Sequence, residues 1–129
     1  METKFLTELK TQDIDDENSF LLEDLIYQSK IYKGIITVPR GFVSDGSSTP
    51  RVPIIFLLYG DRSHREGFLH DFLYRTHLTS KKMADDIFFE AMESREKSFF
   101  LKWGMYLGVK LGGFSSYRTG AERFKILKV

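Results

Sequence analysis

The residues with the clearest chemical potential are an adjacent histidine and aspartate, His70 and Asp71, followed by Tyr74. In a helix, His70 and Tyr74 are four residues apart and share a face, while Asp71 lies about 100° around the axis. The neighbouring positions are apolar: Phe68, Leu69, Phe72 and Leu73. Because burying polar groups without hydrogen-bond partners costs roughly 2–7 kcal/mol each, we expect partners from elsewhere in the chain.

The next predicted helix supplies a candidate partner for His70. The connection Leu78–Ser80 is short, so the two helices should form an antiparallel hairpin centred near residues 77–78. Reflecting position 70 about this centre gives position 85 or 86, and the chain has Asp85 and Asp86 there. Both flank the inward apolar stripe of the helix. Asp85 is slightly preferred, and Asp86 remains open.

This pairing predicts acid–base chemistry. A carboxylate that holds one imidazole nitrogen makes the other nitrogen a better general base. Asp71 and Asp45 could supply hard oxygen ligands for a cation such as Ca²⁺. Asp45 lies in a loop of small and hydroxyl side chains, where backbone amides can approach a ligand closely. Its candidate substrate-binding residues are Gly46, Ser47 and Ser48.

Each of these residues also has a purely structural interpretation. His70 could be a hydrogen-bonded core histidine, and Asp71 could pair with Arg75 four residues on. Asp85 and Asp86 could be ordinary acids near a helix N-terminus, and the loop at Asp45 could be an Asx-type turn. The joint fit of the residues to one hairpin is what supports the functional interpretation.

The elements that would position these residues follow from the hydrophobic pattern. In the N-terminal half, residues 35–38 are all β-branched and are followed by Pro39, which is typical of a strand. Weaker strand signals cover residues 1–12 and 20–27. Together these segments predict a small antiparallel sheet.

The C-terminal half has helical periodicity. We expect helices at about 63–76, 80–94 and 97–111, and a short helix at 54–58 opened by Pro53. The third long helix is nearly apolar all round and is expected to be buried. The tail from Phe114 is expected to return as a strand or wrap the surface. The prediction is one α+β domain over residues 1–129, with a small N-terminal antiparallel sheet and a three-helix C-terminal part built on a central αα-hairpin.

Composition limits the class of protein. The chain has 129 residues, of which 42% are hydrophobic, so it can bury one globular core. It has no cysteine, which excludes disulfides, thiolate metal sites and a cysteine nucleophile. The longest apolar run, Ile54–Tyr59, is too short to span a bilayer. We therefore expect no transmembrane segment.

Charge is unevenly distributed. Acidic residues predominate over residues 1–26, and basic residues predominate over residues 95–129. The two ends could solvate opposite surfaces or pair with each other, or the basic end could meet an anionic partner. No recognised nucleic-acid-binding motif accompanies the basic end.

The residues around the hairpin resemble a family of small proteins encoded by tailed bacteriophages and prophages, described as a domain of unknown function. The resemblance covers about residues 35–113. It rests on Gly41-Phe42-Val43-Ser44-Asp45 through Pro50-Arg51, His70-Asp71-Phe72-Leu73-Tyr74, Ala84-Asp85-Asp86-Ile87-Phe88 to Met92, and an aromatic helix at Trp103–Leu111. It implies a compact α+β phage protein, located in the virion or the bacterial host cytoplasm, and it brings no settled activity.

A second resemblance implies a specific catalytic chemistry. His70-Asp71-x-x-Tyr74, followed on the next helix by an aspartate, is similar to the active-site hairpin of calcium-dependent phospholipases, including the cysteine-poor version in parvovirus capsids. It implies that His70 activates water, that Asp71 binds calcium, that Tyr74 donates a hydrogen bond behind the site, and that Asp85 or Asp86 orients His70. The usual glycine-rich calcium loop is missing directly before the helix.

Two functions from different classes follow. The first is a metal-assisted hydrolase, virion-borne or injected, that acts on lipid esters or other components of the host envelope. The second is a non-enzymatic structural or assembly module of the phage tail, with phage structural proteins as partners. A host-directed inhibitor suits the small size of the chain, although no residue points to it.

Overall fold

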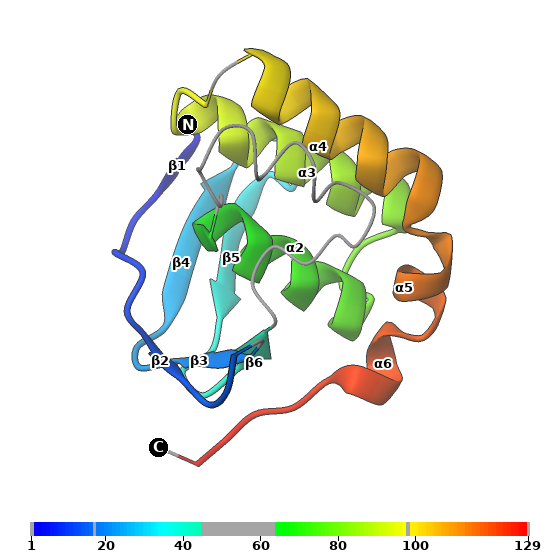
Figure 1. Ribbon diagram of the computed structural model, residues 1–129. Helices are drawn as coiled ribbons and strands as arrows, with labels where there is room; N and C mark the ends of the chain where they lie inside the picture. Colours follow the sequence, from blue (N-terminus) through cyan, green and yellow to red (C-terminus); the bar gives the residue numbers. More distant parts are fainter. Residues whose placement is uncertain (1, 17, 45–63, 98, 129) are drawn as a thin grey trace.

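The computed structural model describes residues 2–16, 18–44, 64–97 and 99–128 (Figure 1). The predicted α+β class is confirmed, because strands occupy the N-terminal part and helices follow. The strands are β1 (Lys4–Phe5), β2 (Thr11–Asp13), β3 (Ser19–Leu21), β4 (Leu25–Ser29), β5 (Gly34–Val38) and β6 (Val43–Ser44). The helices are α2 (His64–Thr76), α3 (Lys81–Ser94), α4 (Phe99–Gly112), α5 (Phe114–Arg118) and α6 (Gly120–Arg123).

The strands form two antiparallel sheets rather than one. Their orders are β1-β4-β5 and β2-β3-β6. The segment predicted as one strand over residues 20–27 is split, since Leu22 and the two acids after it are exposed and carry no strand structure. The Asp24 carboxylate accepts a hydrogen bond of 2.7 Å from the backbone N–H of Arg40. This polar turn lets β3 pair with β6 while β4 pairs with β5.

The main core lies between the strands and the α2–α3 hairpin. In Figure 1, α2 runs in front of β4 and β5, and α3 lies beside it. Fully buried side chains come from both sheets and both helices: Leu21, Leu25, Tyr27, Ile36, Val38, Phe42, Phe68, Leu69, Leu73, Ala84, Ile87 and Ala91. Burial of apolar surface stabilises a fold by roughly 25 cal/mol per Å². The burial of these side chains therefore holds the hairpin against the sheets.

Helix α4 is an outer helix, so the prediction that the third helix is buried was wrong. Its inner side contributes Met105 and Val109 to a second cluster with Phe88 and Met92 of α3. Its other side leaves a row of large apolar residues exposed: Phe99, Trp103, Leu107 and Leu111. An apolar pattern on both faces indicates two apolar surfaces. It does not indicate whether a neighbour covers each of them.

The tail wraps the molecule as predicted, after two short helices that were not predicted. Ile126 forms an antiparallel bridge with Phe42. The backbone N–H of Leu127 donates to the carbonyl of Gly41 at 2.8 Å. Gly41 has a φ of +86°, and a Cβ there would lie 2.1 Å from the Leu127 oxygen, so only glycine suits this contact. The acidic and basic ends also meet, because Asp15, Arg123 and Lys125 line one cavity of about 340 Å³.

Helix α6 approaches α2 so closely that a side chain at Gly120 would not fit. A Cβ there would lie 2.1 Å from the carbonyl oxygen of Tyr74. Gly120→Ala should therefore lower the free energy of unfolding by about 1–3 kcal/mol through overpacking, as measured by urea denaturation. Gly34→Ala is the control, since its Cβ would meet only Tyr32 at 3.8 Å. Equal stability of the two variants would contradict the prediction.

Candidate functional site

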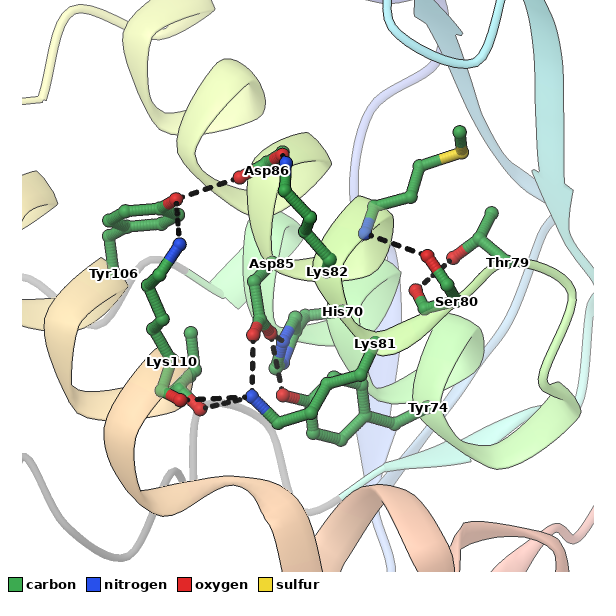
Figure 2. Close-up of polar contacts among 12 residues, drawn as sticks. His70, Tyr74, Thr79, Ser80, Lys81, Lys82, Asp85, Asp86, Tyr106 and Lys110 are labelled. Carbon is green, nitrogen blue, oxygen red and sulfur yellow. Dashed lines mark hydrogen bonds and ion pairs between the residues drawn. The ribbon is translucent and has the colours of Figure 1, made fainter.

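The α2–α3 hairpin brings His70 and Asp85 together. The Nε2 atom of His70 lies 2.9 Å from Oδ1 of Asp85, and each residue is 2% exposed. The predicted reflection about the turn is thus confirmed, with Asp85 as the partner. Asp86 instead accepts hydrogen bonds from Lys82 and Tyr106 (Figure 2). The local cause is the short connection, in which the Ser80 side chain caps α3 by accepting a hydrogen bond from the Met83 N–H.

Two further donors converge on the same carboxylate. The Tyr74 hydroxyl donates to Oδ1 of Asp85 at 2.6 Å, and Nζ of Lys81 donates to Oδ2 at 2.8 Å. Lys81 also donates to the carbonyls of Val109 and Lys110 at the C-terminal end of α4. Figure 2 shows these groups arranged around Asp85. One buried carboxylate therefore joins α2, α3 and α4.

Lys81 was missed in the sequence. The signal was present, because Lys81 and Asp85 are four residues apart, which is the spacing of an ion pair on one helix face. Such pairs are common on exposed faces and usually contribute little there. Here the Lys81 side chain is 13% exposed and the Asp85 side chain 3%, so the pair is largely enclosed.

Apolar rings enclose the imidazole. The centre of the His70 ring lies 4.0 Å from that of Tyr74 and 4.6 Å from that of Phe88. The corner between α4 and α5 closes over the phenol, since a Cβ at Gly113 would lie 2.6 Å from the Tyr74 hydroxyl. The site is an enclosed polar cluster inside an aromatic shell.

The protonation states follow from burial and hydrogen bonding. Burial lowers the pKa of His70, and this effect outweighs the hydrogen bond and charge of Asp85. Burial alone would raise the pKa of Asp85, but hydrogen bonds from His70, Lys81 and Tyr74 bring it below its usual value. Asp85 is then a carboxylate balanced by Lys81, and His70 is neutral. A neutral ring that donates from Nε2 carries its free lone pair on Nδ1.

The lowered pKa of His70 predicts acid sensitivity. In the unfolded chain His70 takes up a proton near its ordinary pKa of 6.5, while the folded chain resists protonation until a lower pH. The unfolded state therefore binds more protons in this window, so the free energy of unfolding should fall as the pH drops below about 6.5. Urea unfolding over a pH series measures this slope.

Two histidine variants test this explanation, one in the cluster and one control outside it. His70→Gln keeps a group that can bond to Asp85 but does not titrate, so part of the slope should disappear. His77→Gln changes an exposed histidine and should keep it. An unchanged slope in the His70 variant would show that other groups cause the acid sensitivity.

Asp71 lies apart from this cluster. It accepts a hydrogen bond of 2.5 Å from the Ser44 hydroxyl, and Nη2 of Arg75 lies 3.8 Å from the same oxygen. The Arg75 pairing considered from the sequence is thus present. The other predicted loop residues, Asp45, Gly46, Ser47 and Ser48, lie outside the described residues.

The described residues do not form a cation site around Asp71. Within them, no group of three or more histidine or acidic side chains is arranged to hold a metal ion. A neighbouring guanidinium also opposes a cation at this carboxylate. The predicted calcium site thus has one described ligand candidate, Asp71, and that group is already paired.

The site falls inside a region shared with a known family. Residues 20–109 match the family model described as "Protein of unknown function (DUF1353)". The chain belongs to this family. The matched region of this DUF1353 protein runs from β3 into α4 and includes His70, Tyr74, Lys81 and Asp85. No curated protein and no solved structure matches the chain.

None of the described helices is both long and apolar enough to cross a membrane.

Proposed function

We propose that this DUF1353 protein is a phage-encoded hydrolase of the phospholipase type, in which His70 is the general base. The observation that carries the proposal is the hydrogen bond between Nε2 of His70 and Oδ1 of Asp85, with Tyr74 donating to the same oxygen. This is the arrangement that the resemblance to calcium-dependent phospholipases implies. The phage origin rests on the sequence resemblance alone.

The proposed reaction is hydrolysis of an ester. Nδ1 of His70 takes a proton from water, and the resulting hydroxide attacks the ester carbonyl carbon to give a tetrahedral intermediate. The bond from that carbon to the alkoxy oxygen then breaks, and the imidazolium returns its proton to the leaving alcohol. Asp85 positions the ring through Nε2 and stabilises its positive charge during the reaction. Lys81 keeps Asp85 ionised.

A lipid is the favoured substrate class. The base is enclosed by the rings of Tyr74 and Phe88, and an acyl chain loses less on entering such surroundings than a polar substrate does. The target would be a component of the host envelope during infection, and the location would be the virion or the host cytoplasm. No step of the reaction is assigned to calcium, because the described residues do not form a site for it.

The test is the release of fatty acid from phospholipid vesicles by the purified protein. Wild type should release fatty acid, His70→Gln should not, and His77→Gln should behave as wild type. Each assay is run with calcium and with EDTA, and calcium is titrated calorimetrically into wild type and Asp71→Asn. Saturable binding that the substitution abolishes would make Asp71 a ligand. The absence of hydrolysis under every condition would refute the hydrolase.

A second candidate is a non-enzymatic assembly module of the phage tail. It is favoured by the completeness of the Asp85 cluster, in which three donors satisfy one carboxylate, and by the exposed apolar row on α4. Its partners would be phage structural proteins. Mass spectrometry of purified virions tests it, since an assembly module of the tail must be present in the particle.

A further inference from the structure

A second site candidate is a cavity of about 580 Å³ between α3 and α4, which does not include the His70 cluster. Its volume lies within the range of small-molecule sites. Its walls come from α3, α4, the turn after β4 and the residue before β1. The lining comprises Asp86, Phe89, Glu90, Glu93 and Ser94 of α3, Trp103 and Tyr106 of α4, and Thr3, Lys30 and Ile31.

Three aromatic rings form one wall of this cavity. The centre of the Phe89 ring lies 4.7 Å from that of Trp103 and 5.2 Å from that of Tyr106, and the ring planes are inclined by 55° and 61°. Trp103 and Tyr106 are nearly perpendicular, at 83°. The faces of such rings carry negative charge density and attract organic cations.

Cations of the chain itself already approach two of these rings. Nζ of Lys102 lies 5.6 Å from the centre of Phe89, and Nζ of Lys110 lies 5.3 Å from the centre of Tyr106. Trp103, the strongest ring type for such contacts, has no lysine or arginine over it within the described part of the chain.

Acidic side chains of α3 also line the cavity. Asp86, Glu90 and Glu93 follow one another on one side of α3. Glu90 is fixed by neutral donors only: the Tyr27 hydroxyl at 2.8 Å, the Ser29 hydroxyl at 2.7 Å and the Ile31 N–H at 3.0 Å. No lysine or arginine in the described ranges forms an ion pair with it. The Glu90 carboxylate is therefore held in place at the cavity by neutral donors.

We propose that this cavity binds an organic cation, specifically a quaternary ammonium group of the choline type. Three neutral donors already occupy the Glu90 carboxylate, so it can still attract charge but has little capacity left for further hydrogen bonds. A quaternary ammonium group has no N–H donors and is held by charge and by aromatic faces. The acidic side chains and the aromatic rings of the lining supply both. Thr3 of the lining adds a polar group, a buried hydroxyl without a hydrogen-bond partner in the described structure.

The only tryptophan of the chain lies in this wall, so its fluorescence reports binding directly. Choline is titrated into the full chain and Trp103 emission is recorded, with 3,3-dimethylbutan-1-ol as a probe of nearly the same shape without the charge. Choline should give a saturable change, and the neutral alcohol should bind at least roughly tenfold more weakly. Equal affinities of the two probes, or no response to choline, would overturn the proposal.

Variants test the carboxylate and the aromatic rings separately. Glu90→Gln keeps an acceptor for Tyr27 and Ser29 but removes the charge, and it should weaken choline binding roughly tenfold. Tyr106→Leu removes one ring and should also weaken it. Glu23→Gln removes an exposed acid that pairs with Lys10 and is not part of the cavity lining, and it should change nothing. Wild-type affinity in Glu90→Gln that is folded by circular dichroism would refute the site.

The same site could receive a free cation or a phosphatidylcholine headgroup. Cosedimentation with phosphatidylcholine vesicles, competed by choline, would identify the lipid as the source. Choline binding without vesicle binding would identify a free cation. Both results support the site, and neither depends on whether His70 catalyses hydrolysis.

Discussion

Asp85→Ala should lower the free energy of unfolding by about 3–5 kcal/mol, because it removes one partner from a buried ionic cluster. The carboxylate accepts hydrogen bonds from His70, Tyr74 and Lys81, and the residue is 2% exposed. Without it, a largely enclosed ammonium group and a buried phenol lose their acceptor. Urea denaturation measures the loss, and the Lys81 charge should account for much of it.

The neighbouring aspartate is the matched control for this prediction. Asp86 pairs with Lys82, whose side chain is 78% exposed, and accepts a hydrogen bond from Tyr106, so Asp86→Ala should cost about 1–2 kcal/mol. Asp85→Asn separates charge from shape, since its amide oxygen still accepts but its NH₂ group faces donors. It should fall between the other two variants. Similar losses for Asp85→Ala and Asp86→Ala would show that the cluster is not the anchor of the hairpin.

Loss of the general base should reduce the rate of ester hydrolysis by roughly 10²–10⁴-fold in His70→Gln. Tyr74→Phe keeps the ring beside the imidazole and removes only the hydrogen bond to Asp85. That bond positions the base indirectly, so the expected rate loss is roughly tenfold. Initial rates of fatty-acid release, compared with urea stability for each variant, distinguish the two effects.

The graded series also separates the two candidate functions. A hydrolase requires the rate losses to follow the order His70→Gln, then Tyr74→Phe, whatever the stability of each variant. If the rate in each variant merely tracks the folded fraction, the cluster is structural and the assembly module is favoured.

The sequence predicted the hairpin well because its signals are local. The 3.6-residue periodicity defines the inward faces of α2 and α3, and the short connection fixes their antiparallel pairing. Simple reflection about the turn then placed a carboxylate level with His70. Periodicity alone did not distinguish Asp85 from Asp86, because each flanks the inward stripe, and which flank faces α2 depends on packing.

What the sequence did not predict depends on contacts between distant segments. The division of the strands into two sheets follows from β3 pairing with β6, and no local pattern specifies that choice. The exposure of Trp103 and Leu107 depends on whether a neighbour covers α4. The cavity beside Glu90 joins the residue before β1 and the turn after β4 to two helices, so composition and spacing could not reveal it.

The return of the chain end to Gly41 and Phe42 sets an order of events during folding. The β4–β5 pair and the α2–α3 hairpin close short loops, whereas the contacts of Ile126 and Leu127 join segments that are far apart in the sequence. Closing the longest loop costs the most entropy before any contact repays it, so this docking should come late. Within β6, the backbone N–H of Val43 donates to the carbonyl of Lys125, so this bond should form only in that last step.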